Sequence, residues 1–238
     1  MNLKELADDL PRDQIDKETI YKSALRQNSN LKETSIHWLI NRLIDEGLLL
    51  RVGRNKYQVA IEDAKQVYYH TFSAFLQKLV DDLEARFPLI QFQAWEAIQF
   101  NRFANHQIAK NLYFIEVEKM LENAVYDFLR EKYDTQVLLK PAKEMCEVYV
   151  DDGTIIVQTL ISEAPVDRSD PHHVVLEKLL VDLLADEKME LFLERAEFGD
   201  IIQEALDRYV LNASRMLRYA RRRNREEALR RHLKNSGK

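Results

Sequence analysis

Residues 30–47 carry the pattern that most limits the folds open to this chain. Apolar residues recur there at helical spacing: Ile36, Leu39, Ile40, Leu43 and Ile44. Asn30 and Glu33 have the spacing of a capping box at the start of a helix, and Gly47 is a residue type that commonly ends one. The segment therefore predicts an amphipathic helix of about four turns, whose apolar side must be covered by other elements.

A helix before this segment and a hairpin after it would supply that cover. Asp16 is placed to cap a helix that runs to about Gln27. After the second helix, two apolar runs within 48–59 flank a polar turn at 53–56, which predicts a short β-hairpin. Helix, short turn, helix and hairpin in this order predict a winged helix-turn-helix over residues 1–60.

The outward side of the second helix carries residues suited to reading DNA. In a helix-turn-helix the second helix lies in the major groove, where exposed side chains contact base edges. Asn41 and Arg42 have the geometry for bidentate contacts with adenine and guanine. Trp38 is instead expected to pack against the hairpin as a core residue. The predicted DNA-binding residues are Thr34, Ser35, His37, Asn41 and Arg42 on the helix, and Arg51, Arg54 and Lys56 on the hairpin.

The rest of the chain predicts a larger domain that contains helices and strands. Helices are expected at 72–83 and 118–132, and strands at 89–95, 111–117, 136–139, 147–150 and 154–160, the last two joined by a turn at 151–153. After Pro165 the pattern is helical, at 174–184, 188–195, 198–211 and 213–233. The predicted fold is mixed α+β, with an N-terminal winged helix-turn-helix, a central α/β layer and a C-terminal helical segment. Two domains are expected, at 1–60 and 66–238.

Charge is unevenly distributed along the chain, although the total is only −5. Residues 1–60 carry a net +1, residues 61–214 carry −14, and residues 215–238, with ten basic and two acidic residues, carry +8. Helices in this last segment would pack one side and keep the other basic. The arginines would either neutralise the acidic middle of the chain or contact nucleic-acid phosphates, and the sequence favours neither role.

Several classes of protein are disfavoured. Cys146 is the only cysteine, which excludes an intramolecular disulfide and a cysteine-rich zinc site, and we expect it to be a small buried thiol. No apolar run has the roughly 20 residues of a membrane span and the first residues lack signal-peptide features, so we expect a cytoplasmic protein. His172 and His173 are expected in a polar loop rather than around a metal. Phosphate-binding glycine loops and nucleophile motifs do not occur, and we expect no cofactor.

The strongest candidate for catalysis is the segment 114–119, Phe-Ile-Glu-Val-Glu-Lys. Metal-dependent nucleases hold magnesium with carboxylates at a strand end and use a nearby lysine. Their acid and lysine lie two positions apart on one face of the strand, whereas Lys119 directly follows Glu118, and Glu116 shares the face of Glu118. A second acid on a neighbouring strand is also required, and only Glu96, directly after the predicted strand 89–95, is available. We therefore expect a structural role for these carboxylates.

With these residues in view, the chain resembles the AbiEi-type antitoxins and transcriptional regulators of type IV toxin-antitoxin and abortive-infection systems. The likeness spans nearly the whole chain and depends on the order of its motifs. These are Thr34-Ser35-Ile36-His37-Trp38, Gly47, Arg51-Val52-Gly53-Arg54, the segment 114–119, Val137-Leu138-Leu139-Lys140-Pro141, Ser162-Glu163-Ala164-Pro165, Leu176-Glu177-Lys178-Leu179-Leu180-Val181-Asp182, Asn212 and Leu217-Arg218-Tyr219-Ala220-Arg221-Arg222. One departure is Asn55, which stands where a second glycine is expected after Arg54.

The resemblance implies a protein that is not an enzyme. Its winged helix would bind double-stranded operator DNA and repress its own operon, and the rest of the chain would oppose a nucleotidyltransferase-like toxin encoded beside it, without a stable complex. Two alternatives stay open: a metal-dependent DNA nuclease that uses Glu116, Glu118 and Lys119, and an interaction scaffold that binds no DNA. The operator, the toxin and the oligomeric state are not predicted.

Overall fold

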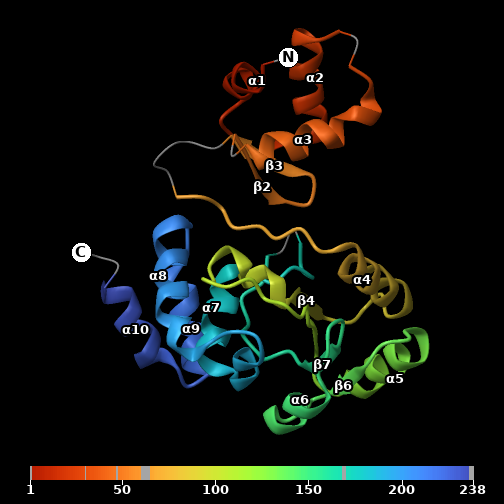
Figure 1. The fold of residues 1–238 in the computed structure, drawn as a ribbon, viewed down its shortest axis with the longest axis vertical. Helices are drawn as coiled ribbons and strands as arrows, with labels where there is room; N and C mark the ends of the chain where they lie inside the picture. The colour runs from red at the N-terminus through yellow and green to blue at the C-terminus, as the bar shows by residue number, and fades with distance from the viewer. Residues whose placement is uncertain (1, 30, 47, 60–64, 168–169, 236–238) are drawn as a thin grey trace. The chain divides into compact units, whose positions relative to one another are not determined.

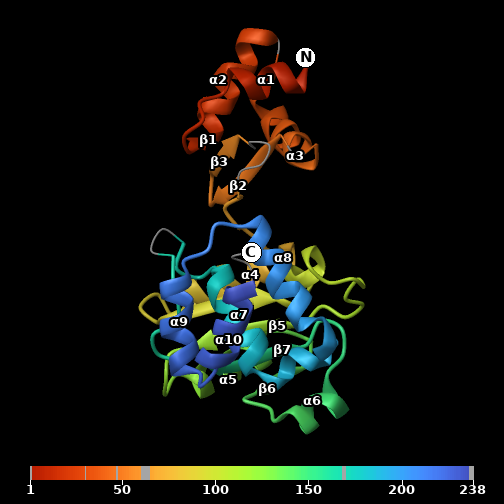
Figure 2. The same cartoon turned by 90° about the vertical axis from the view of Figure 1, so that its left-hand side faces the viewer.

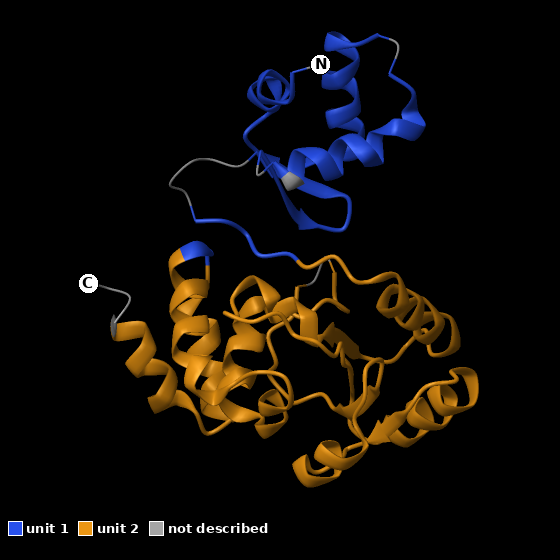
Figure 3. Cartoon of the chain, in the orientation of Figure 1, with its two compact units in different colours: residues 1–69, 208–210 blue, residues 70–207, 211–238 orange. Residues whose placement is uncertain are grey.

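The computed structural model describes residues 2–29, 31–46, 48–59, 65–167 and 170–235, drawn in Figure 1 and, turned by 90°, in Figure 2. The chain divides into two compact units (Figure 3). Unit 1 contains residues 1–69 with 208–210, and unit 2 contains residues 70–207 with 211–238. Helices and strands occur in both, so the fold is mixed α+β, as predicted. No helix within the described residues is long and apolar enough to cross a membrane.

The described part of unit 1 contains three α-helices and a small antiparallel sheet. In chain order its elements are α1 (Leu3–Asp9), β1 (Ile15–Asp16), α2 (Lys17–Gln27), the 3-10 turn η1 (Glu33–Ser35), α3 (Ile36–Asp45), β2 (Leu49–Gly53) and β3 (Lys56–Val59). The sheet has the order β1-β3-β2, so β1 pairs with the second strand of the hairpin. The sequence pattern predicts neither α1 nor β1.

Local signals account for the start of α2 but not for that of α3. The Asp16 side chain accepts hydrogen bonds from the backbone N–H and the hydroxyl of Thr19, both at 2.8 Å, and caps α2 as predicted. Helix α3 instead follows the 3-10 turn η1, and neither Lys32 nor Ser35 provides a side-chain cap. The predicted capping and terminating residues of this helix, Asn30 and Gly47, lie outside the described residues.

The apolar side of α3 forms the centre of the unit 1 core, as its spacing predicts. Its buried residues, at most 2% exposed, are Ile36, Leu39, Ile40 and Leu43. They pack with Leu6 of α1, Ile20 of α2 and Tyr57 of β3. Each fully buried aliphatic side chain contributes about 1.5–3 kcal/mol of hydrophobic stabilisation, so this side of α3 is fixed by the core. The opposite side is left for other contacts.

The hairpin turns over two residues, Arg54 and Asn55, between the paired residues Gly53 and Lys56. Asn55 has a φ of 56°, in the left-handed region that glycine and asparagine tolerate better than other residues. The asparagine that replaces the expected glycine is therefore compatible with a tight turn at this position.

We predict that Asn55→Gly will leave the free energy of unfolding nearly unchanged, whereas Asn55→Ala will lower it by about 1 kcal/mol, because alanine is disfavoured at positive φ. Urea denaturation followed by circular dichroism would measure both changes. Equal losses in the two variants would show that the Asn55 side chain, rather than its backbone conformation, supports the turn.

Unit 2 is built on a sheet with the strand order β4-β5-β7-β6. Strand β4 (Phe92–Glu96) runs antiparallel to β5 (Tyr113–Val117), whereas β5, β7 (Ile155–Thr159) and β6 (Val137–Leu139) are parallel. Helix α5 (Glu122–Lys132) connects β5 to β6, and α6 (Lys143–Tyr149) connects β6 to β7. The carboxyl ends of the three parallel strands therefore lie along one edge of the sheet.

Helices cover both faces of this sheet (Figures 1 and 2). Helices α4 (Ala74–Arg86) and α5 pack on one face, over Ile115 and Val157. Helix α7 (Leu176–Ala185) lies on the other face, toward which Glu116 of β5 points, and α9 (Ala213–Arg222) packs on α7. Further elements of unit 2 are the 3-10 turn η2 (Ala97–Arg102) and the helices α8 (Phe198–Arg208) and α10 (Glu226–Asn235).

One predicted strand is wrong. Residues 147–150 are predicted to form a strand, but most of them belong to helix α6. Cys146 is the buried residue of that helix, as expected for its thiol, whereas Val148 and Tyr149 are 72% and 59% exposed. A helix with a single buried position shows no helical period in its sequence. The turn at 151–153 leads from α6 into β7 instead of closing a hairpin.

Two predicted C-terminal helices are also wrong. Residues 188–195 form parts of two 3-10 turns, η3 (Glu187–Leu191) and η4 (Arg195–Glu197), in place of an α-helix. The single helix predicted over 213–233 is divided into α9 and α10. Asn224, with a φ of 56°, ends α9, and the N–H of Arg225 donates to the carbonyl of Ala220 at 2.8 Å. This is the hydrogen-bond pattern of a Schellman motif, here formed by asparagine rather than glycine.

Candidate functional site

Helix α3 presents a polar side to solvent, opposite the side fixed by the unit 1 core. Of the predicted DNA-binding residues on this helix and the turn before it, Thr34, His37, Asn41 and Arg42 are exposed, and Ser35 is half-buried. His37 and Asn41 lie one turn apart, as do Trp38 and Arg42. The structure therefore brings these side chains together on one exposed surface.

Trp38 lies on this surface and not in the core, which corrects the expectation that it packs against the hairpin. Trp38 is 59% exposed, and the guanidinium carbon of Arg42 lies 5.3 Å from the centre of the Trp38 ring. The helical period explains the result, because position 38 lies off the buried stripe 36, 39, 40 and 43. The position of Trp38 on the helix, and not the size of its side chain, therefore decides that it is exposed.

A cation from α2 joins the exposed side of α3. The ammonium nitrogen of Lys17, the first residue of α2, lies 3.3 Å from Nε2 of His37. Sequence reasoning missed Lys17, since only the folded arrangement of the two helices places it beside α3.

The Nε atom of Arg42 lies 3.6 Å from a carboxylate oxygen of Glu46. Both side chains are about half exposed, so the pair contributes little stability and leaves the guanidinium available.

The predicted hairpin residues occupy two different environments. Arg54 and Lys56 are exposed at the turn. Arg51 is half-buried, and its guanidinium carbon lies 5.8 Å from the ring centre of Tyr57 and 5.6 Å from that of Tyr69. The guanidinium of Arg51 is therefore engaged with aromatic rings of unit 1, whereas Arg54 and Lys56 are open to a ligand.

The carboxylates considered for catalysis have separate partners. Glu116 is 2% exposed, and its Oε1 accepts hydrogen bonds from Nε1 of Trp95 at 2.9 Å and from the Lys178 ammonium at 2.6 Å. Glu118 follows the end of β5, and its Oε1 accepts a hydrogen bond from the backbone N–H of Gln91 at 2.9 Å. Glu96 is fully buried and bonded to other residues, namely His70, Ser73 and Asn111.

Lys178 is the centre of a buried ionic network on the α7 face of the sheet. Its side chain is fully buried and donates to Glu116 and to Oδ2 of Asp182, both at 2.6 Å. Burial alone would lower the pKa of Lys178, but the two carboxylates raise it above the ordinary value of a lysine, so this side chain is charged. Asp182 Oδ1 also accepts a hydrogen bond from the Tyr219 hydroxyl at 2.9 Å and pairs with Arg223 at 3.0 Å.

The two adjacent histidines are placed in different surroundings. His172 stacks on Phe92, with ring centres 3.9 Å apart, and its Nε2 lies 3.0 Å from Glu84. His173 stacks on Phe72 at 3.6 Å. Both are partly buried, so they serve packing as well as polar contacts. Among the described residues there is no group of three or more His, Cys, Asp and Glu side chains suited to hold a metal ion.

The arginine-rich segment makes many of its contacts within unit 2. Arg223 is mostly buried and pairs with Asp182 at 3.0 Å, instead of lying on the basic outer side that is predicted for these helices. Arg221 and Arg230 both pair with Glu226, at 2.7 Å each. Of these three arginines, Arg223 alone pairs with a carboxylate of the acidic middle of the chain, because Glu226 belongs to the same C-terminal segment as its partners. Arg218 and Arg231 are exposed.

We predict that Lys178→Met will lower the free energy of unfolding of unit 2 by about 3–5 kcal/mol, because the Glu116 and Asp182 carboxylates stay buried without their cation. Lys110→Met, which removes a lysine paired with the exposed Asp151, is the matched control and should cost less than about 1 kcal/mol. Urea titration of both variants measures the difference.

Plasmid cleavage assays with the wild-type protein and with glutamate variants test the nuclease alternative. The wild-type protein and Glu116→Gln are both expected to leave plasmid DNA uncut in magnesium or manganese, because Glu116 is bonded to Trp95 and Lys178 in the protein interior. Glu118→Gln is the comparison variant. If the wild type cut the plasmid and Glu116→Gln did not, the buried carboxylate of Glu116 would be catalytic.

Comparison with known proteins places the chain in a family. A model described as a family of unknown function (DUF6577) matches residues 35–238, from the start of α3 onward, and the chain belongs to this family. No curated protein matches it. Among solved structures it is similar to the crystal structure of the RV2827C protein from Mycobacterium tuberculosis, at 12% identity and a TM-score of 0.33, over 91% of this chain and 68% of that one.

Proposed function

We propose that this member of the DUF6577 family is a sequence-specific double-stranded DNA-binding protein, with residues 1–60 forming a winged helix-turn-helix. The observation that carries the proposal is the division of α3 into two sides. One side is buried in the core, and the other exposes hydrogen-bonding groups of His37, Asn41 and Arg42. Side chains of these types are those that read base edges in the major groove.

The order and pairing of the elements support this use of α3. Helices α2 and α3 follow one another in the chain and contact each other, and the β2–β3 hairpin comes directly after them. In a helix-turn-helix the second helix enters the major groove with its N-terminal residues nearest the bases. Thr34 and His37 would then reach the DNA first, with Asn41 and Arg42 one turn further along.

The exposed tryptophan distinguishes this surface from an ordinary solvated helix. Trp38 exposes more than half of its area and lies beside Arg42 in the middle of the polar side. Tryptophan is enriched in binding interfaces relative to the rest of a protein surface. Contact with DNA would cover the ring, for instance against a thymine methyl group, while Arg42 turns from Trp38 and Glu46 toward a base.

The neighbouring cations would contact the DNA backbone. Arg54 and Lys56 are exposed on the hairpin, and Lys17 lies beside His37 at the start of α2. Contacts between such side chains and phosphates position a protein on the duplex without reading its sequence, and they weaken as salt is added. Arg51, whose guanidinium lies near the rings of Tyr57 and Tyr69, is assigned no direct contact with DNA.

The resemblance to AbiEi-type antitoxins supports a more specific role. The protein would repress its own operon and oppose a nucleotidyltransferase-like toxin encoded beside it, as a non-enzymatic cytoplasmic antitoxin and without a stable complex. Co-expression with the neighbouring gene tests this role. The antitoxin proposal requires that the full chain restore growth to cells that express the toxin, and it is withdrawn if growth is not restored at equal toxin levels.

The binding proposal is tested by footprinting the region upstream of the gene. We predict protection of an inverted or direct repeat at about 0.1 M salt, because one recognition helix reads only a few base pairs and specificity commonly needs two half-sites. Equal affinity for this region and for random duplexes of the same length would remove the regulator proposal. Absence of binding to any duplex would favour the interaction scaffold.

We further predict that α3 and the hairpin contribute differently. Asn41→Ala or Arg42→Ala should cost about 1–3 kcal/mol on the operator and less on random DNA. Arg54→Ala or Lys56→Ala should weaken binding to both DNAs alike. Each lost phosphate contact should also reduce the slope of log affinity against log salt concentration by about one unit. Arg12→Ala, which removes an exposed arginine that pairs with Asp8 in the segment between α1 and β1, is the control. A uniform loss from Asn41→Ala and Arg42→Ala would mean that α3 is not the reading helix.

A further inference from the structure

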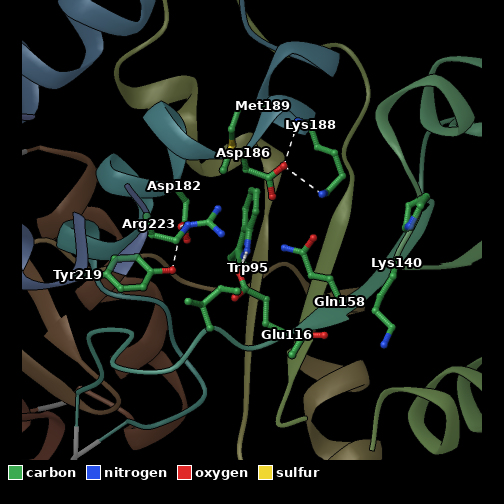
Figure 4. Close-up of a pocket in the computed structure, with 13 residues that line it drawn as sticks. Trp95, Glu116, Lys140, Gln158, Asp182, Asp186, Lys188, Met189, Tyr219 and Arg223 are labelled. Carbon is green, nitrogen blue, oxygen red and sulfur yellow. Dashed lines mark hydrogen bonds and ion pairs between the residues drawn. The ribbon is translucent and has the colours of Figure 1, made fainter. Parts of the chain in front are cut away.

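A cavity of about 220 Å³ in unit 2 has no part in the proposed DNA binding (Figure 4). Its floor is formed at the sheet by Glu116 of β5, Gln158 of β7 and Lys140, the residue after β6. The opposite wall comes from the C-terminal helical region and includes Asp186 and Arg223. The cavity therefore lies at the carboxyl ends of the parallel strands, where open α/β sheets bind their ligands.

The backbone at this edge carries a second mark of a functional site. Each connection after a parallel strand contains a non-glycine residue with positive φ: Met120 after β5 at 80°, Lys140 after β6 at 42° and Glu163 after β7 at 64°. Such conformations cost about 1–3 kcal/mol each and gather at ligand-binding and active sites. Lys140 itself lines the cavity.

The charges around the cavity are balanced. Four carboxylates are paired with four cations: Glu116 and Asp182 with Lys178 and Arg223, Asp186 with Lys188, and Glu122 with Lys140. A ligand with a net charge would add an uncompensated charge to this low-dielectric surrounding, which is costly. A ligand without net charge avoids that cost, provided that it satisfies the polar groups that face the cavity.

Those polar groups include both donors and acceptors. Both oxygens of Asp182 are engaged, by Lys178 on one side and by Tyr219 and Arg223 on the other. Arg223 uses only its Nε in this pair, and Asp186 uses its Oδ1 for the backbone N–H and the ammonium of Lys188, both at 3.0 Å. Figure 4 shows the Arg223 guanidinium, the second oxygen of Asp186 and the Gln158 amide turned toward the space beside Trp95, and the Lys140 ammonium turned away.

We propose that this cavity binds a free amino acid, with its carboxylate held by Arg223 and its ammonium group held by Asp186. A guanidinium binds a carboxylate through two parallel hydrogen bonds, and a carboxylate is the matching partner for an ammonium group. The cavity is several times larger than the roughly 30 Å³ of one water molecule, so it has room for a small side chain as well. The Gln158 amide is placed to bond to the ligand backbone or side chain.

The test is isothermal titration calorimetry on the full chain with each of the twenty standard L-amino acids. At least one is expected to bind saturably below about 10 mM. Its two analogues, the acid without the ammonium group and the amine without the carboxylate, should each bind at least about tenfold more weakly, the loss expected for one charge-assisted contact. For leucine these analogues are 4-methylpentanoate and 3-methylbutylamine.

Two variants should shift the preference in opposite directions. Asp186→Asn leaves the cavity with a net positive charge, so the amino acid should bind at least about tenfold more weakly and the acid analogue more tightly than in the wild type. Lys188→Gln leaves a net negative charge and should favour the amine analogue. Asp151→Asn removes an exposed aspartate paired with Lys110, outside the cavity, and should change neither affinity.

These opposite shifts separate ligand recognition from folding, since an unfolded variant would bind none of the compounds. The proposal is overturned if no amino acid binds at 10 mM, if either analogue binds as tightly as the amino acid, or if glucose or adenosine binds while amino acids do not. It is also overturned if both variants keep the wild-type preference. DNA binding by the same preparations is measured separately, so that failure of one proposal leaves the other standing.

Discussion

The arrangement of unit 2 depends on the buried ammonium group of Lys178. It lies between a carboxylate of the sheet, Glu116, and one of its own helix, Asp182, so loss of any one of the three charges would leave another buried without its partner where α7 packs on the sheet. Tyr219 and Arg223 extend the same contacts to the end of α9. An arginine-rich segment thereby becomes part of the fold of an acidic domain, and the cavity beside Trp95 is formed by the groups that complete the network.

In unit 1, by contrast, the core fixes the position of helix α3, and the polar side chains of this helix take little part in the packing. The buried side of α3 sets the orientation of the helix, while its outward side chains make few contacts of their own, such as the pair of Arg42 with Glu46. Side chains carried on a rigid helix can bind without the further cost of ordering the backbone, which suits them to recognise a rigid partner such as duplex DNA.

The sequence predicts what depends on neighbouring residues and misses what depends on distant ones. The Asp16 cap, the period of α3 and the hairpin all have local signals, and the structure contains them. Lys178 stands in an apolar helix with no sign that it is buried, because Glu116 is sixty-two positions away. The exposed predicted residues of α3 followed from helical geometry, whereas the position of Lys17 beside them, and the whole cavity, arise only from tertiary packing.

The long-range network also sets an order in which the protein can be made. A ribosome adds about 5–20 residues per second, so a nascent chain carries Glu116 and Lys178 for seconds before Tyr219 and Arg223 emerge. During that interval Asp182 lacks two of its partners, and the sheet face that holds Trp95 lacks its last cover. The core around α3 draws on residues 3–59 and meets no such delay. Aggregation during synthesis should therefore begin at the unfinished face of unit 2.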